Sequence, residues 1–535
     1  MIPQIRRPAT QRSQASQIPA AVHGVNAISG IARMGPEECI YCYNLLAEDF
    51  GMEVRDGYVE WANGWVGGPA KTVITFQGNV DADDMLWVAN EEGIWNVTAK
   101  GTTAPVQELV WPSSGGNAGI CSYVNFTNDG NERFLLLCDG QNGYYVWEQA
   151  TGLWAQGTFS AGDVDVELLD FVMIWKKRVW FIERASANAW YLPTASFSGN
   201  ATAFNFGDQF RFGGALVSLN NWTLDGGEGI DDYLVALSAA GDVVVYRGTD
   251  PSEAADFGVH GSWYVGEVPI GNRIASEFSG ELYVISVYGL VAMSQLLNGA
   301  DSADPNTYVT RKISPYVRQV MDETIKEFGW HIHVHPKQSI LYLNSPPRFS
   351  KPQLAFTLYL GNMSWSIVRG LNKSHTANWQ GEVYWTDLNR NKLYVQAGNV
   401  DGVYLDPEVD GQPEAIDWDM LTSYQDLGEP ARFKRCQYVR PMFIGQGLPA
   451  FQVEAYYDYE IDEQYGYPVI GPSNHSTWGT AVWDVDVWAG GLQTSDNPRG
   501  TTGMGRYVAV NIRGRSSTAV TLAAFDIIYD YGGLL

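Results

Sequence analysis

Short apolar segments alternate with polar, glycine-containing turns along most of the chain. Residues 85–89 and 94–97 flank the turn at 90–93, and residues 234–237 and 243–246 repeat this arrangement further on. Each segment is four or five residues long and rich in aliphatic and aromatic side chains, which favours β-strands over helices. Two such strands joined by a tight turn predict an antiparallel hairpin.

The strand–turn–strand unit recurs at a spacing on the order of 50 residues, which is typical of propeller blades of four strands each. Helical periodicity is nearly absent, and this disfavours a helical solenoid. The sequence therefore predicts an all-β fold with a β-propeller of six or seven blades across residues 71–405. The seven predicted pairs lie within residues 85–97, 134–147, 179–192, 234–246, 282–294, 340–360 and 383–397.

The rest of the chain divides into three parts. Residues 1–18 are polar and basic, without the apolar region of a secretory signal, and predict a flexible arm. This arm is either a frayed terminus or a segment that orders against a neighbouring subunit. Residues 19–70 predict a lead-in with a short helix and a first strand. Residues 406–535 begin with an acidic, turn-rich stretch and continue in β-prone runs, among them a predicted strand at residues 482–487. This pattern predicts a C-terminal β-rich domain, sandwich-like or barrel-like. One later helix is predicted at residues 314–328.

Composition fits this architecture and adds a constraint through charge. The 535 residues include 57 glycines and 13% aromatic side chains, which suits many short strands and turns. Net charge is −26, from 60 acidic and 34 basic residues. Because affinity for the phosphate backbone depends on Lys and Arg, so acidic a chain is a poor DNA-gripping protein, although it suits a conduit through which DNA slides. The alternative is a plain acidic soluble protein.

No apolar run in the sequence reaches the length of a membrane-spanning helix.

The block of residues 190–251 carries a distinctive set of motifs. It contains YLP, then FG-x-x-FR-x-GG, WTLDGGEGIDDY and VYRGTDPS. These motifs resemble a family of tail proteins from short-tailed bacteriophages, described as the tail nozzle or hub, tail tubular protein B or packaged-DNA stabilisation protein. The resemblance continues at residues 18–58 and at residues 427–443 (LGEPARFKRCQYVRPMF), and so covers most of the chain from Ile18 onward.

The resemblance implies a structural virion protein rather than an enzyme, with no cofactor. Family members would form a ring of about six subunits below the portal and its adaptor, the head-to-tail connector. Such a ring holds the packaged genome and provides the channel for its ejection. Further partners would be tail fibre or needle proteins, and double-stranded DNA that passes without sequence-specific binding. The implied location is the virion tail, assembled in the host cytoplasm. Acidic residues on the channel wall would repel the duplex and keep it moving.

Five cysteines in a chain of this length argue for a reducing compartment and against a disulfide framework. Cys39 and Cys42 form a C-x-x-C, but no second pair completes a zinc site. Read as a helix, this segment places both cysteines on one face, which predicts buried, small apolar residues. Redox or metal chemistry is the alternative. The remaining three are Cys121, Cys138 and Cys436.

Two groups of residues are candidate metal ligands. His331, His333 and His335 alternate in WHIHVHP, so a strand would place them on one face about 7 Å apart. They are either a metal or pH-switch site or one half-exposed strand face. The second group lies in the loop LDGGEGIDDY, where carboxylates around glycines suit calcium, although the EF-hand pattern is absent and an acidic turn is the alternative. Its members are Asp225, Glu228, Asp231 and Asp232.

Two further clusters are candidates for assembly contacts. One is the set of arginines in the N-terminal arm, and the other is an acidic cluster that otherwise reads as a solvated loop. They consist of Arg6, Arg7 and Arg12, and of Asp81, Asp83 and Asp84.

Two other function classes fit a propeller. One is a carbohydrate-binding protein or glycoside hydrolase, and a retaining hydrolase needs two carboxyls about 5 Å apart. The other is a protein-binding adaptor, which predicts a monomer with an exposed patch on the top face. The sequence holds no G-x-S-x-G, H-E-x-x-H or Walker A motif.

Overall fold

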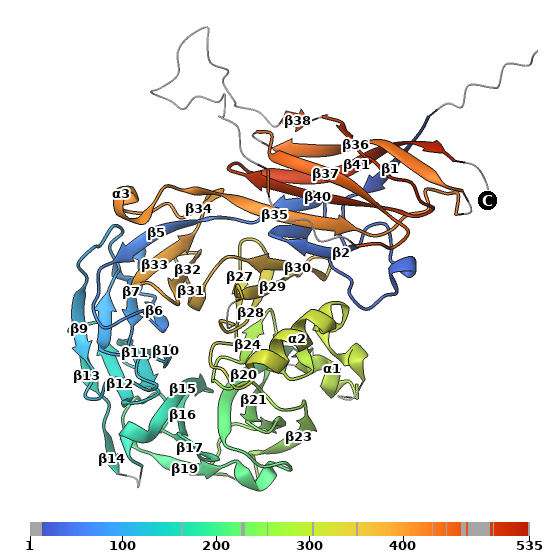
Figure 1. Ribbon diagram of the computed structural model, residues 1–535. Coiled ribbons are helices and arrows are strands. Elements are labelled where there is room, and N and C mark those ends of the chain that lie inside the picture. Colours follow the sequence, from blue (N-terminus) through green and yellow to red (C-terminus); the bar gives the residue numbers. More distant parts are fainter. Residues whose placement is uncertain are drawn as a thin grey trace, which may run out of the picture.

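The computed structural model describes residues 13–161, 164–225, 230–253, 255–301, 304–348, 351–430, 432–445, 447–461, 467–468, 493–495 and 497–532. Within them the chain forms a ring of small β-sheets and a β-sandwich that packs on one side of the ring (Figure 1). The predicted fold class, a β-propeller with a further β-rich region, is confirmed.

Seven blades surround the axis of the ring. In chain order, the first four are β6–β9 (Thr72–Phe76, Met85–Ala89, Gly93–Asn96, Val106–Val110), β10–β13 (Cys121–Thr127, Arg133–Asp139, Gly143–Glu148, Leu153–Gln156), β15, β16, β17 and β19 (Leu169–Trp175, Arg178–Glu183, Asn188–Tyr191, Thr202–Asn205), and β20–β23 (Leu216–Asp225, Ile230–Ser238, Asp242–Arg247, Gly258–Tyr264). The next three are β24–β26 (Ala275–Phe278, Glu281–Ser286, Gly289–Ala292), β27–β30 (His331–His335, Ile340–Asn344, Leu354–Tyr359, Ser364–Arg369), and β31–β33 with β5 (Lys373–Trp379, Glu382–Asp387, Lys392–Gln396, Tyr58–Asn63). The short strands β14 (Phe159–Ala161) and β18 (Gly199–Asn200) pair outside these blades.

The predicted hairpins are the second and third strands of the blades. For example, β7 and β8 pair in the register Val88↔Trp95, and β21 and β22 in the register Val235↔Val245. Because neighbouring blades cover both faces of these strands, nearly every residue in them is apolar, and each strand appears in the sequence as a continuous apolar run. The first strand of each blade lines the axis and mixes polar with apolar residues, which is why the pattern did not show it.

The ring closes through a strand from the N-terminal side of the propeller. β5 pairs antiparallel with β33, with Leu393 opposite Ala62, and becomes the outer strand of the last blade. This strand precedes residue 71, where the repeated pattern begins. The last blade therefore contains strands from both ends of the propeller. The backbone hydrogen bonds between β5 and β33 join these two ends.

The β-sandwich combines both ends of the chain. One sheet runs β3-β4-β41-β36-β38, with β1 also on β41 and β39 on β36, and the other continues the blade strand β30 through β2, β35, β40 and β37, with β34 on β35. Trp418, Phe443 and Phe451 stack between the two sheets. The strands are β1 (Gln14–Pro19), β2 (Cys39–Tyr43), β3 (Leu45–Glu48), β4 (Gly51–Val54), β34 (Val400–Asp401), β35 (Glu414–Thr422), β36 (Lys434–Gly445), β37 (Ala450–Tyr457), β38 (Gln493–Ser495), β39 (Arg499–Gly500), β40 (Val508–Ser516) and β41 (Val520–Tyr531).

Two expectations for the N-terminal region are corrected. The predicted helix around the C-x-x-C is strand β2, because it fits between β30 and β35 and both neighbours supply backbone partners that outweigh a weak local helix propensity. The arm predicted to be flexible to residue 18 is ordered from Gln14, since β1 pairs along its length with β41. The predicted strand at residues 482–487 lies outside the described residues.

Helices are few in the part of the chain that the structure describes. The predicted helix at 314–328 is present as α2 (Ser314–Thr324), which buries Val317, Val320 and Met321. The others are α1 (Met293–Leu297), α3 (Pro407–Asp410) and six 3-10 turns at Ile31–Arg33, Asp81–Asp83, Val166–Leu168, Gly207–Gln209, Pro305–Thr307 and Val309–Ile313. None of the described helices has the length and hydropathy to cross a membrane.

Candidate functional site

The candidate site is a polar cavity of about 250 Å³ on the propeller axis. The innermost strands of four blades and the start of a fifth converge there, because the first strand of each blade faces the axis. Polar side chains are tolerated at this position because the cavity gives them room. The lining residues are Cys121, Ser122 and Tyr123 of β10, Phe171 and Val172 of β15, Asn272, Arg273 and Ala275 at β24, His331 and Ile332 of β27, and His375 and Thr376 of β31.

Arg273 crosses the axis from one blade to another. It precedes β24, and its guanidinium donates to the carbonyl oxygen of Lys71 at 3.0 Å and to Thr72 Oγ1 at 2.6 Å, at the start of β6. A longer contact of 3.5 Å reaches the carbonyl oxygen of Cys121, while Nε is covered and has no hydrogen-bond partner among the described residues. The ring of Phe328 lies 5.3 Å from the guanidinium. Burial lowers the pKa of Arg273 to about 10, so the group stays charged at neutral pH.

The three predicted histidines share one strand, β27, but its face is not half-exposed as predicted. The exposed fractions of His331, His333 and His335 are 2%, 7% and 3%. The cause is β31 of the next blade, whose Thr376 hydroxyl lies 3.0 Å from both His331 Nε2 and His333 Nδ1. His375, which the pattern did not single out, stands with its ring centre 6.0 Å from that of His331. Among the described residues, no group of three His, Cys, Asp or Glu side chains has the geometry of a metal site.

Burial of these histidines predicts acid sensitivity. Desolvation lowers the pKa of His331 to about 3 and also lowers the pKa values of His333 and His375, with Arg273 and Lys373 nearby adding like charge. In the unfolded chain histidine titrates near 6.5. Below that pH the unfolded state binds protons that the native state excludes, so stability falls as the pH drops from about 6.5 towards 3.

The test is urea unfolding of the wild type and of His333→Asn at pH 7 and pH 5. Asn Oδ1 replaces the Nδ1 acceptor that faces Asn344 at 3.1 Å. We expect the wild type to lose about 2 kcal/mol more than the variant between the two pH values. The control is His23→Asn, because His23 is an exposed residue. Equal losses in the wild type and His333→Asn would contradict the prediction.

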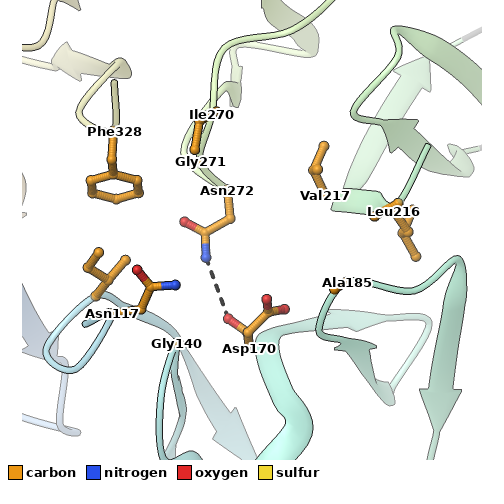
Figure 2. Close-up of a pocket in the computed structure, with 12 residues that line it drawn as sticks. Asn117, Gly140, Asp170, Ala185, Leu216, Val217, Ile270, Gly271, Asn272 and Phe328 are labelled. Carbon is orange, nitrogen blue, oxygen red and sulfur yellow. Dashed lines mark hydrogen bonds between the residues drawn. The ribbon is translucent and has the colours of Figure 1, made fainter. Parts of the chain in front are cut away.

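Two further cavities adjoin the axis at the face where the inner strands begin. One, of about 220 Å³, is shown in Figure 2, with Phe328 and Ile270 on one side and Asp170 opposite. Asn272 Nδ2 donates to the backbone oxygen of Asp170 at 3.5 Å, and burial raises the pKa of the Asp170 carboxyl to about 6. The other, of about 340 Å³, shares Phe328 with it and reaches Lys373.

The acidic candidates are not brought together. Asp84 is buried and accepts from the backbone N–H of Gly78 at 2.8 Å, so its carboxylate shapes its own loop. Asp81 and Asp83 lie in a 3-10 turn beside it. Asp232 accepts from Thr223 across the β20–β21 hairpin at 2.8 Å. Outside the described residues lie Glu228, the side chains of Asp225 and Asp231, and the arm residues Arg6, Arg7 and Arg12.

All five cysteines are buried, which confirms that part of the interpretation. Cys42 Sγ donates to the carbonyl oxygen of Leu45 at 3.2 Å. Burial raises the pKa of Cys39, whereas a hydrogen bond from Cys39 lowers the pKa of Cys42. They lie on a strand with an irregular register, not on a helical face.

Sequence reasoning missed the residues that define the cavity, chiefly Arg273 and His375. Neither stands in a recurrent motif, and each comes to the axis because its blade closes the ring. The sequence offers one weak signal for such residues, namely polar side chains just before or within the first strand of a blade. Examples are GNRIAS at residues 271–276 and KSHTAN at residues 373–378.

No protein-family model and no curated protein matches the chain. Among solved structures, one similar protein is the extracellular domain of a hybrid two-component system from B. thetaiotaomicron. The alignment covers 84% of this chain and 57% of that structure, at 11% identity and a TM-score of 0.39. The β-propeller domain of Cps50 (Swd1) from Myceliophteria thermophila aligns with 64% of this chain and 98% of its own, at 10% identity and a TM-score of 0.36. Because both TM-scores are below 0.5, the fold is assigned from the strand pairing within this chain and not from these similarities.

Proposed function

We propose that this chain is the ring-forming nozzle of a short bacteriophage tail, which retains packaged DNA and provides the channel for its ejection. The motifs of residues 190–251 support the family, and the outer rim of the propeller supports the ring. A nozzle needs subunit contacts on the sides of the propeller, whereas an adaptor needs a patch on its top face.

The observation that carries the proposal is apolar exposure on the outer strands of two adjacent blades. Val106 and Val110 of β9 and Leu153 of β13 are 68%, 65% and 68% exposed. Both strands lie at the periphery of the ring, and Trp154 Nε1 of β13 donates to Glu108 of β9 at 3.3 Å (Figure 1). Large aliphatic side chains exposed on neighbouring outer strands suit a subunit contact at this side of the propeller.

The propeller axis offers no route for DNA. Arg273 spans it, and the cavity beside this side chain holds about 250 Å³. A DNA channel in this protein would therefore lie between subunits, on the axis of the assembly. The net charge of −26 favours passage of a duplex without adhesion, because like charges repel. A channel wall of neutral or basic residues would contradict this part of the proposal.

The experiment is the solution mass of the full chain and of a variant with Val106, Val110 and Leu153 all replaced by serine. We expect an assembly near six times 59.2 kDa, either alone or on a purified portal–adaptor complex. The triple variant should stay monomeric in both conditions, since removing three exposed apolar anchors weakens each interface. Val409→Ser is the control, because Val409 is 79% exposed and belongs to α3, outside the two outer strands β9 and β13. A wild type that remains monomeric with the complex would refute the proposal.

The carbohydrate alternative finds no support in these cavities. Within the described residues, Asp232 and Asp256 line a common cavity, but it lacks a tryptophan floor. Asp256 also accepts from the Thr249 hydroxyl and from the backbone N–H groups of Asp250 and Thr249, which lower its pKa and fix it in its own loop.

A further inference from the structure

The axial cavity contains a cation that no carboxylate balances. Arg273 is the one charged side chain among the lining residues of this cavity, which include no Asp or Glu. Within the described part of the chain it forms hydrogen bonds to two carbonyl oxygens and one hydroxyl, and no ion pair. Two buried cations elsewhere in the chain do have such partners: Arg55 pairs with Asp401, and Lys392 with Glu60. A half-buried guanidinium without a carboxylate is therefore unusual in a protein with so many acidic residues.

A second donor faces the same space. His375 Nδ1 accepts the backbone N–H of Val73 at 3.1 Å, so the neutral ring carries its proton on Nε2. Within the described residues this Nε2 has no hydrogen-bond partner, and the ring keeps part of its surface open to the cavity. Arg273 and Asn272 are likewise only partly covered, although they lie deep within the ring. The cavity thus presents one fixed cation and a neutral N–H donor without an acceptor.

We propose that the axial cavity binds a small tetrahedral oxyanion, such as inorganic phosphate, between Arg273 and His375. One N–H of Arg273 Nη1 remains beyond the bond to Lys71, and with the Nε2–H of His375 it suits two oxygens of such an anion. The apolar side chains of Phe171, Val172 and Ile332 form part of the wall, and polar side chains such as Ser122 and Thr376 offer further hydrogen bonds. The volume accommodates an anion with several waters, each of which occupies about 30 Å³. A bound anion would connect two non-adjacent blades, those of β24 and β31, and stabilise the ring. This site is independent of the nozzle proposal, because it lies within one subunit.

The first test is thermal unfolding of the full chain in sodium phosphate or sodium sulfate against sodium chloride at equal ionic strength. We expect both oxyanions to raise the midpoint relative to chloride, in proportion to the logarithm of their concentration above Kd. Arg273→Met should weaken binding at least about tenfold and reduce the difference to the general stabilisation that excluded phosphate and sulfate give any folded protein. Arg178→Met is the control, since Arg178 pairs with Asp250 outside the cavity and should leave the full response intact. A response as large in Arg273→Met as in Arg178→Met would overturn the proposal, and an equal response to acetate would overturn the preference for a tetrahedral anion.

The second test does not depend on a folded variant. Crystals of the wild type grown without phosphate or sulfate are soaked in sodium selenate, and the anomalous map is calculated. We expect a peak within hydrogen-bond distance of the Arg273 guanidinium. If Arg273→Met fails to fold, this map and the wild-type midpoints decide: an empty cavity with equal midpoints in phosphate and chloride would refute the site.

Discussion

Replacement of Glu60 by alanine is expected to destabilise the folded chain by about 3–5 kcal/mol, since removal of one partner leaves a buried charge network incomplete. Glu60 lies on β5, the strand that closes the propeller, and is fully buried. Its carboxylate pairs with Lys392 of β33 at 3.2 Å and accepts from the side chain of Asn63 at 2.6 Å and the backbone N–H of Leu405 at 3.0 Å. Alanine would leave the Asn63 amide and the Leu405 N–H without this acceptor, leave Lys392 with Asp410 as its carboxylate partner, and loosen the closing strand.

The measurement is urea unfolding of the wild type and Glu60→Ala at pH 7. Glu382→Ala is the control in the same blade, because Glu382 and Lys337 form an exposed pair, and such pairs contribute at most about 1 kcal/mol. Glu60→Gln should fall between the two, since it keeps an acceptor but loses the charge. A loss below about 1 kcal/mol for Glu60→Ala would show that β5 does not hold the ring closed.

The second large effect is expected at Lys373, whose replacement by methionine should stabilise the protein at neutral and acidic pH. Lys373 is 2% exposed, and its ammonium donates to Gln396 Oε1 at 3.2 Å and lies over the rings of Tyr342 and Trp385. Burial, together with the charge of Arg55, lowers the pKa of Lys373 from 10.5 to about 7. One pKa unit corresponds to about 1.4 kcal/mol, so a shift of this size amounts to several kcal/mol.

The pH dependence distinguishes charge from packing. Between pH 7 and 10.5 the unfolded chain binds a proton at Lys373 that the native state has lost, so the native state gains stability as the pH rises. Below pH 7 the native state also carries the proton on Lys373, so the full cost of burying the charged ammonium is present. Urea unfolding should therefore show the largest gain for Lys373→Met near pH 6 and little gain near pH 10. Lys337→Met is the control, because Lys337 is exposed. A gain that does not change with pH would argue that methionine acts through packing alone.

The hairpins could be predicted because the residues that specify them are local. The segments 85–89 and 94–97 need only the intervening turn to meet, and both are apolar because adjacent blades cover both faces. The first strand of a blade lacks this property. β10, for example, carries Ser122 and Asn125 among its apolar residues because it faces the axis, and no short-range pattern marks it as a strand.

The strand order of the sandwich was decided by tertiary structure. β1 and β41 pair with Gln14 opposite Tyr529, and β2 takes its neighbours from β30 and β35, far along the chain. Local preference for a helix or a frayed arm is small beside the hydrogen bonds and burial that these partners supply. The candidate cavity has the same origin, since Arg273 meets Thr72 only when non-adjacent blades face each other across the axis. Local pattern therefore determined the repeated hairpins and the all-β class, whereas closure of the ring and pairing of the chain ends determined which polar residues meet.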